Sequence, residues 1–309
     1  MLGKYWIKPL VLFSFFFSIM ISPAFPKEGA QFLPRFSIKI TKGWGPDLRI
    51  GDMNTHLESF NNMGTFLYYR QNEPELISGE IETLDGVVPD WNLEFRLDIS
   101  RRIGLALGTS MPCQKANDST IDWTMLVGQR MVYTIRPRIQ VLPPVIWSVY
   151  YDLLPNSRFG IQLNLGGGLY LVRMSEYYNI ELTLPPQEPL WWRRTWATDI
   201  CGTIGAHVGV EIDIPITKAI ALVTEFQGWY ARVNKLYGSL LEETIYGGYD
   251  EYRGPLYFFT RLDDYTGDRY ADIQTAYAGP IWYLPANARL SSFDLSRYSF
   301  RIGIKFKLF

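Results

Sequence analysis

The feature that most constrains this chain is a strict alternation of apolar and polar side chains over residues 91–99. The run from Trp91 to Ile99 has no exception. Successive side chains of a β-strand point to opposite faces, so this period of two predicts a strand with one apolar face. A second alternating run, 103–109, follows the short break at 100–102, with glycine and alanine between its apolar residues. The two runs predict a hairpin with a tight turn.

The same alternation recurs along the chain and predicts eight strands. The runs lie at 36–44, 91–99, 103–109, 133–151, 159–171, 199–213, 220–230 and 298–308. The fourth run is long for a single strand, and Pro143 and Pro144 interrupt it. Residues 121–128 could also add a strand pair. Ten strands are therefore the alternative to eight.

The connections between these runs sort by length. Those at 100–102, 154–158 and 214–218 are short, whereas those at 45–87, 112–129, 180–195 and 233–293 are long. Short and long connections alternate strictly. A closed, antiparallel, up-and-down transmembrane barrel has this arrangement, with short turns on one rim and long extracellular loops on the other. A soluble barrel or sandwich has no reason to separate its connections in this way.

The amino-terminal segment resembles a processing signal. Lys4 and Lys8 precede or flank an apolar run at 10–21, and Ser22-Pro23-Ala24 offers small residues for cleavage. The run is short for a membrane-spanning helix. We therefore expect a signal peptide at 1–24 and a barrel domain at 25–309, exported through the secretory pathway.

Composition fits a barrel in lipid and excludes a nucleic-acid-binding protein. Mean hydropathy is −0.05, which looks soluble. A membrane barrel has such a value because only half of each strand faces lipid. The chain has 30 lysines and arginines against 31 acidic residues, so it lacks the basic surplus of a nucleic-acid-binding domain.

The last alternating run, 298–309, ends in an aromatic residue, Phe309. Together with the amino-terminal signal and the eight runs, this end resembles the small bacterial outer-membrane β-barrel proteins of the OmpA, OmpX and OmpW type. The resemblance is one of architecture and covers nearly the whole mature chain. It implies an all-β fold, an outer-membrane location in contact with lipid, and recognition of Phe309 by the barrel-assembly machinery. It supplies no catalytic residues.

Eight strands enclose a lumen that side chains can fill, and the polar faces of the runs supply the charges for it. Buried charges must be paired, so the sequence predicts an ion-pair network that plugs the barrel. An ion pathway lined by the same groups is the alternative. The predicted lumen residues are Glu94, Arg96, Asp98, Arg136, Arg138, Asp199, Glu211, Asp213, Glu225, Arg301 and Lys305.

Aromatic residues near the ends of the runs predict girdles at the two lipid–water boundaries. The loop-side set is Trp44, Tyr133, Tyr177, Trp196, Tyr230 and Tyr298, and the turn-side set is Trp147, Tyr151, Phe159, Phe306 and Phe309. A further cluster predicts an interfacial anchor whose arginines contact lipid phosphates. It consists of Trp191, Trp192, Arg193, Arg194 and Trp196.

The connection at 233–293 is rich in tyrosines and acids. It either contacts an extracellular protein or glycan or folds on itself as an extension of the barrel wall. The overall prediction is an outer-membrane protein with a structural or surface-interaction role and a plugged lumen. A narrow OmpW-like conduit for small or hydrophobic solutes is the alternative.

We expect no enzyme, and an outer-membrane lipid-modifying enzyme is the less favoured alternative. Only His56 and His207 could act as imidazole bases, and neither lies in a recognisable Ser–His–acid pattern. The sequence predicts no cofactor and no metal site. Cys113 and Cys201 fall on distant strands, so we expect no disulfide between them.

Overall fold

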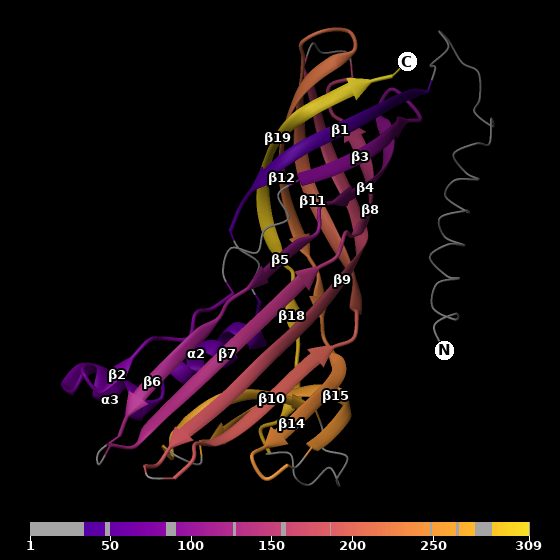
Figure 1. Ribbon diagram of the computed structural model, residues 1–309. Helices are drawn as coiled ribbons and strands as arrows, with labels where there is room; N and C mark the ends of the chain where they lie inside the picture. Colours follow the sequence, from indigo (N-terminus) through magenta and orange to yellow (C-terminus); the bar gives the residue numbers. More distant parts are fainter. Residues whose placement is uncertain are drawn as a thin grey trace. The chain divides into compact units, whose positions relative to one another are not determined.

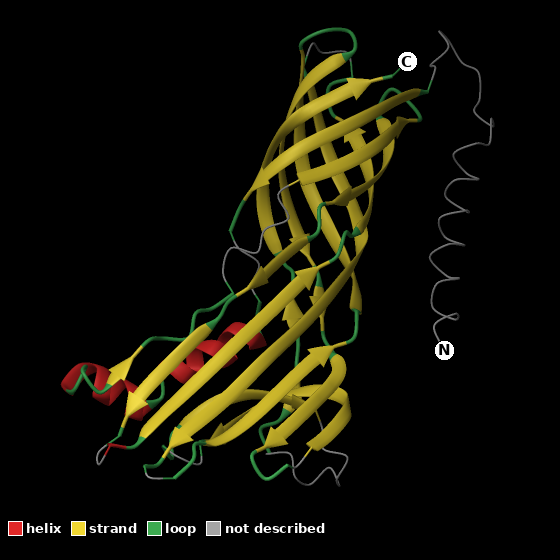
Figure 2. Cartoon of the chain, viewed as in Figure 1, coloured by secondary structure: helices red, strands yellow, loops and turns green. Residues whose placement is uncertain are grey.

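The computed structural model describes residues 34–46, 50–84, 91–125, 128–155, 159–185, 187–247, 249–263, 266–275 and 286–308. The predicted signal peptide at 1–24 and the terminal Phe309 lie outside these residues. Strands make up most of the described chain, and two helices accompany them (Figure 1, Figure 2). Neither of these helices is long and apolar enough to span a membrane.

Eight strands close into a ring. In ring order they are β1 (Arg35–Trp44), β3 (Trp91–Asp98), β4 (Ile103–Ser110), β8 (Val145–Asp152), β9 (Gly160–Thr183), β11 (Cys201–Pro215), β12 (Ile220–Tyr230) and β19 (Arg297–Lys307). Each strand pairs antiparallel with the next, and β19 pairs with β1. The prediction of a closed, eight-stranded antiparallel barrel is therefore confirmed. Closure leaves the ring without an open edge.

Strand β11 shows how the alternation places side chains. Ile204 and Val208 point outward and are 74% and 60% exposed, whereas His207 and Glu211 point inward and are buried. The apolar outer face continues on the neighbouring strands, where Leu165 and Phe226 are exposed. The barrel thus has an apolar outside and a polar inside, as a barrel in lipid requires.

The fourth predicted run is two strands instead of one. Residues 130–141 form β7 (Arg130–Val141), and β8 begins only at Val145. The break falls at Leu142, Pro143 and Pro144, where the two prolines have no N–H to donate to a neighbouring strand. Strand β8 belongs to the ring, and β7 lies beyond it, paired with the second half of β9.

The sheet continues past the ring through β9, which is 24 residues long. Its first half pairs with β8 and β11, and its second half pairs with β7 and with β10 (Leu190–Thr198). Further strands join on either side: β5 (Cys113–Ala116), β6 (Ser119–Thr124) and β2 (Ile77–Ser78) beyond β7, and β14 (Tyr237–Thr244), β15 (Tyr249–Leu262), β16 (Arg269–Thr275) and β17 (Arg289–Leu290) beyond β10. We use the name extension for β7, β10, these further strands, the second half of β9 and the two helices.

The long connections predicted as loops are therefore largely folded. The segment 233–293 contains β14 to β17, which supports its reading as an extension of the wall. Two short strands, β13 (Arg232–Val233) and β18 (Phe293–Asp294), pair separately.

Helices α2 (Asp52–Asn61) and α3 (Gly64–Asn72) cover the inner face of the extension. Phe60 on α2 contacts the rings of Tyr133, Tyr178 and Tyr270, which come from β7, β9 and β16. These side chains are buried in a hydrophobic core with Met53, Leu57 and Phe66. The extension thus has a hydrophobic core of its own. Its apolar side chains face this core, whereas the apolar side chains of the ring face outward.

The apolar side of the sheet changes at the rim. On β9, Leu163 and Leu165 point out of the barrel and are exposed, but from Val172 onward the apolar residues Met174 and Tyr178 point into the extension core. The adjacent pair Leu171 and Val172 marks this change of phase. An apolar stripe therefore faces outward in the ring and inward in the extension.

This change explains which of the predicted girdle residues lie on the outer face. Trp44, Tyr230 and Tyr298 are exposed at the rim next to the extension, and Tyr151, Phe159 and Phe306 are exposed toward the other rim. Tyr133 and Trp196 are instead buried in the extension core, so their assignment to a girdle is wrong. Trp147 and Tyr177 are half-buried.

A substitution on β11 tests the outward register. Val208→Arg should destabilise insertion by about 2 to 4 kcal/mol, because it would put a charge on the outer face near mid-strand. Val208→Leu at the same position is the matched control and should have little effect. Folding into vesicles followed over a urea series, with heat-modifiable gel migration as the readout, measures both. Equal insertion of the arginine and leucine variants would contradict the register.

Candidate functional site

Lys39 is the centre of the barrel interior. Its side chain is fully buried, and its Nζ lies 2.7 Å from Glu211 Oε2, 3.2 Å from Glu94 Oε1 and 3.3 Å from Glu225 Oε2. The Nζ also donates a hydrogen bond of 2.8 Å to Tyr150 OH, which in turn donates one of 2.8 Å to Glu94. One ammonium thus joins carboxylates from β3, β11 and β12.

Two further cations extend this network toward the turn rim. Arg96 Nε lies 2.6 Å from Asp98, and its guanidinium also contacts Gln162 and, at 3.6 Å, Glu211. Lys305 contacts Glu211 and lies 2.7 Å from Asp213. Gly104 leaves room for the arginine, since a Cβ there would lie 2.6 Å from Arg96 Nε. The network therefore joins side chains from β3, β9, β11 and β19 across the ring.

Arg301 and Asn164 bind the other side of Glu225. Arg301 donates a 2.7 Å hydrogen bond to Gln227 and lies 3.8 Å from Glu225, and Asn164 donates a 2.6 Å bond to Glu225. Seven of the eight ring strands contribute a polar side chain to this connected set, which we call the lumen network. It consists of Lys39, Glu94, Arg96, Asp98, Tyr150, Gln162, Asn164, Glu211, Asp213, Glu225, Gln227, Arg301 and Lys305.

The structure brings together most of the predicted lumen charges. Those that lie in the lumen network are Glu94, Arg96, Asp98, Glu211, Asp213, Glu225, Arg301 and Lys305. The prediction missed Lys39 and Tyr150. Lys39 could have been found, because it lies on the polar face of the first alternating run. Tyr150 lies on the inward face of β8, where an aromatic residue gives no charge signal.

Three predicted lumen residues lie elsewhere. Arg136 and Arg138 are exposed on the outer face of β7, and Arg136 pairs with Asp118 at 2.9 Å. Asp199 is exposed beyond β10 and pairs with Arg253 at 2.9 Å. The prediction assumed that the apolar face of 133–141 faces lipid, whereas it faces the extension core. The charges opposite that face therefore point to the outside.

The predicted interfacial anchor is also largely wrong. Arg194 and Trp196 are fully buried on the inner face of β10, where Arg194 makes hydrogen bonds of 2.6 and 2.8 Å to Asp272. Trp191 and Trp192 are half-buried, and only Arg193 is exposed, stacked over Trp191. Because β10 lies in the extension core, two of these five residues cannot reach a lipid phosphate.

A second polar cluster lies buried in the extension, around His56 on α2. Its Nδ1 lies 2.6 Å from the carbonyl oxygen of Ala271, and its Nε2 lies 2.9 Å from Glu176 Oε2. Both neighbours are acceptors, so only the doubly protonated imidazolium can satisfy both nitrogens. Glu176 also accepts from the Trp196 indole at 3.2 Å.

Neighbouring charged groups determine the protonation states of His56 and Asp272. Burial alone would lower the pKa of His56, but the charge and hydrogen bonding of Glu176, with a contribution from Asp272, raise it above its ordinary value. Burial would raise the pKa of Asp272, but the Arg194 guanidinium holds it below its ordinary value. The cluster is therefore most stable with His56 charged and Asp272 ionised.

The one serine–histidine contact in the described barrel does not resemble a catalytic arrangement. Ser148 Oγ and His207 Nε2 lie 3.0 Å apart, and both side chains are buried inside the barrel. No described residue hydrogen-bonds to Nδ1 of His207. Nucleophilic catalysis needs an oriented base and an accessible nucleophile, and this pair has neither.

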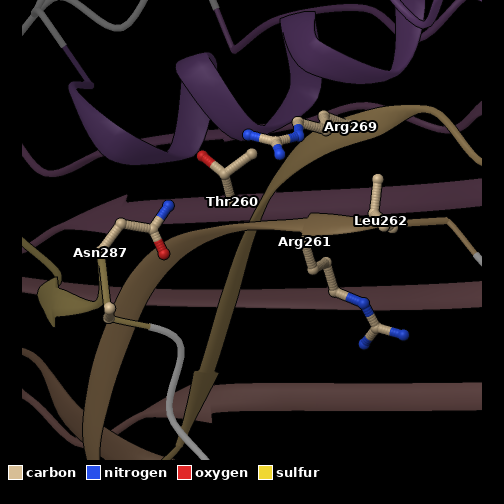
Figure 3. A pocket seen from close by; sticks show the side chains of 6 residues that line it. Thr260, Arg261, Leu262, Arg269 and Asn287 are labelled. Carbon is tan, nitrogen blue, oxygen red and sulfur yellow. The ribbon is translucent and has the colours of Figure 1, made fainter.

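A shallow pocket lies at the end of β15 and β16 (Figure 3). It has a volume of about 320 Å³ and is lined by Thr260, Arg261, Leu262, Arg269, Ala286 and Asn287. Arg261 and Arg269 point to opposite sides of the ribbon, so they do not converge on one ligand. Arg261 is also 3.6 Å from the buried Asp272. Among the described residues, no group of three or more His, Cys, Asp or Glu is placed to hold a metal, and Cys113 and Cys201 form no disulfide.

No protein family and no curated protein matches the chain. Solved structures that resemble it include a major outer membrane protein from Thermus thermophilus, with 10% identity, 90% of this chain and 100% of that chain covered, and a TM-score of 0.35. The outer membrane protein OprG from Pseudomonas aeruginosa has 11% identity, coverage of 89% and 94%, and a TM-score of 0.33. CarO from Acinetobacter baumannii has 13% identity, coverage of 72% and 93%, and a TM-score of 0.29. The fold assignment rests on the strand pairing and not on these scores.

Lys39→Met tests the lumen network. It would leave three buried carboxylates without their shared cation, which should cost about 3 to 5 kcal/mol of stability. Lys42→Met is the matched control, because Lys42 lies on the same strand but points outward, near the rings of Trp44 and Trp91. It should cost about 1 kcal/mol or less. Urea unfolding in detergent measures both, and similar losses would show that Lys39 is not central.

The His56 cluster predicts a pH dependence of the extension. The folded-state pKa of His56 is raised, so its contribution is complete below about pH 6.5 and is lost as pH rises through the folded pKa. Amide-exchange protection factors of α2 and β16 should therefore fall as pH rises above about 6.5. In His56→Gln this fall should disappear. A decline that persists unchanged in the variant would assign it to another group.

Proposed function

We propose that the protein is a bacterial outer-membrane β-barrel whose lumen is closed by ion pairs and whose extension presents a folded surface outside the cell. The lumen network carries this proposal, since it connects side chains from seven of the eight ring strands around the buried Lys39. An eight-stranded ring is narrow enough for such side chains to fill it. The role is structural and interactive rather than catalytic.

The position of the termini supports the orientation. Strand β1 begins and β19 ends at the rim that carries the short turns, where Ser37 pairs with Lys307. In outer-membrane barrels this rim faces the periplasm. The extension grows from the opposite rim and would therefore lie outside the cell, where we expect its exposed surface to contact another protein or a glycan. Insertion would require the barrel-assembly machinery.

A narrow conduit is the second candidate, and one observation favours it. Several buried polar atoms on the extension side of the lumen network have no hydrogen-bond partner among the described residues: Thr41 Oγ1, Asn92 Oδ1, Tyr170 OH, His207 Nδ1, Trp229 Nε1 and Ser299 Oγ. Buried polar groups of this kind are usually satisfied by ordered water. Water could thus enter from that side, but it would meet the lumen network below.

Single-channel conductance in a planar bilayer separates the two candidates. The refolded mature protein, shown to be folded by heat-modifiable migration, should give no steady conductance. Steady current that changes in Glu211→Gln but not in Arg136→Gln would overturn the closed barrel and favour the conduit. Arg136 is a suitable control because its exposed side chain lies outside the ring.

A further inference from the structure

The outward face of β9 carries an apolar stripe that ends in a charge. Leu163 and Leu165 are exposed on this face, and Leu169 and Leu171 follow them, half-buried. The next residue of the same parity is Arg173, which is exposed. A stripe that faces hydrocarbon thus gives way to a guanidinium within one step along the strand. In a barrel that spans a membrane, such a change from apolar to charged side chains occurs where the lipid headgroups begin.

A second arginine lies beside it on β7. In the β7–β9 register Arg138 is opposite Ser175 and Gln140 is opposite Arg173, so the two arginines are diagonal neighbours on the outward face. Diagonal neighbours lie about 7 to 8 Å apart, within reach of one phosphate for long side chains. Both side chains are exposed.

Neither guanidinium has a partner among the described residues, since neither makes a hydrogen bond or an ion pair there. Nearby carboxylates are already engaged: Asp118 pairs with Arg136, and Asp199 pairs with Arg253. The arginines are therefore free to bind an anion from outside the protein.

On one side of Arg138 the sheet carries only small side chains. In the register across the sheet, Ser175, Ala197 and Ser239 follow one another between Arg138 and Arg253. These small side chains do not cover the arginine from that side. A headgroup could therefore approach along the sheet without displacing a side chain.

We propose that Arg138 and Arg173 bind the phosphate of a lipid headgroup in the leaflet next to the extension. Arginine suits this role, because its planar fork of N–H donors matches phosphate oxygens. Basic residues at this depth also gain from the negative potential of anionic lipid. The site takes the place of the anchor predicted at Arg193 and Arg194, of which Arg194 is buried. It rests on the proposed membrane location.

Native mass spectrometry of the folded full-length protein in detergent tests the site, with diphosphorylated lipid A as the probe. Arg138→Gln/Arg173→Gln should bind this lipid about 10- to 30-fold more weakly than wild type. The matched control is Arg193→Gln, an exposed arginine on the same face that is stacked over Trp191 and should leave binding unchanged. Dephosphorylated lipid A should bind wild type and the double variant equally.

Two results would overturn the proposal: equal binding by wild type and the double variant, or binding of dephosphorylated lipid A as strongly as the phosphorylated form. Full competition by inorganic phosphate would identify a site for the free ion and overturn the lipid assignment. Heat-modifiable migration and vesicle flotation of the same samples separate this failure from a failure of the membrane location. A protein that floats with vesicles but shows no phosphate preference would contradict the site alone.

Discussion

The burial of Lys39 is the constraint on which the barrel interior depends. An ammonium group removed from water is tolerated only where carboxylates surround it, and Glu94, Glu211 and Glu225 do so at 2.7 to 3.3 Å. Those carboxylates come from strands on different sides of the ring, so the charge fixes how the strands face one another. Lys305, Arg96 and Arg301 then neutralise the same acids from other directions. The same contacts therefore join strands that are not neighbours in the ring, such as β1 and β11.

The extension also buries charged side chains next to groups of opposite charge, and it does so with different residues. Its core is apolar, with Phe60 and Tyr178 in ring contact, yet it contains His56, Glu176, Arg194 and Asp272 with their side chains fully buried. The bidentate contact of Arg194 with Asp272 ties β10 to β16, and His56 ties α2 to both Glu176 and the backbone of β16. Polar contacts therefore set the order of the layers, and the surrounding aromatic residues fill the space between them.

The ring could be predicted from the sequence, because the same alternation of apolar and polar side chains recurs on its strands. The run at 91–99 shows this, and parity alone placed Glu94 and Glu211 inside. The extension could not be predicted, since β7 alternates just as regularly as the ring strands while its apolar face meets a protein core. Periodicity reports which face is apolar but not what covers it. Arg136 and Arg138 were misplaced for that reason, and the local signals of the change are the Leu171–Val172 pair and the two prolines at 143 and 144. Arg194 and Trp196 were misplaced because a cluster of tryptophan and arginine suits a lipid interface by residue type, whereas here both side chains are buried.

The extension core is assembled from every long connection of the barrel. Phe60 lies between the ring strands β1 and β3, Tyr133 between β4 and β8, Trp196 between β9 and β11, and Tyr270 between β12 and β19. No single hairpin can therefore complete this core. The apolar face of each hairpin stays uncovered until the other hairpins are in place. The ring, by contrast, can grow strand by strand. The order of assembly then follows from topology: the extension is the last part to become stable. A chain stalled before its final strand would hold an open ring and an unfinished core at the same time.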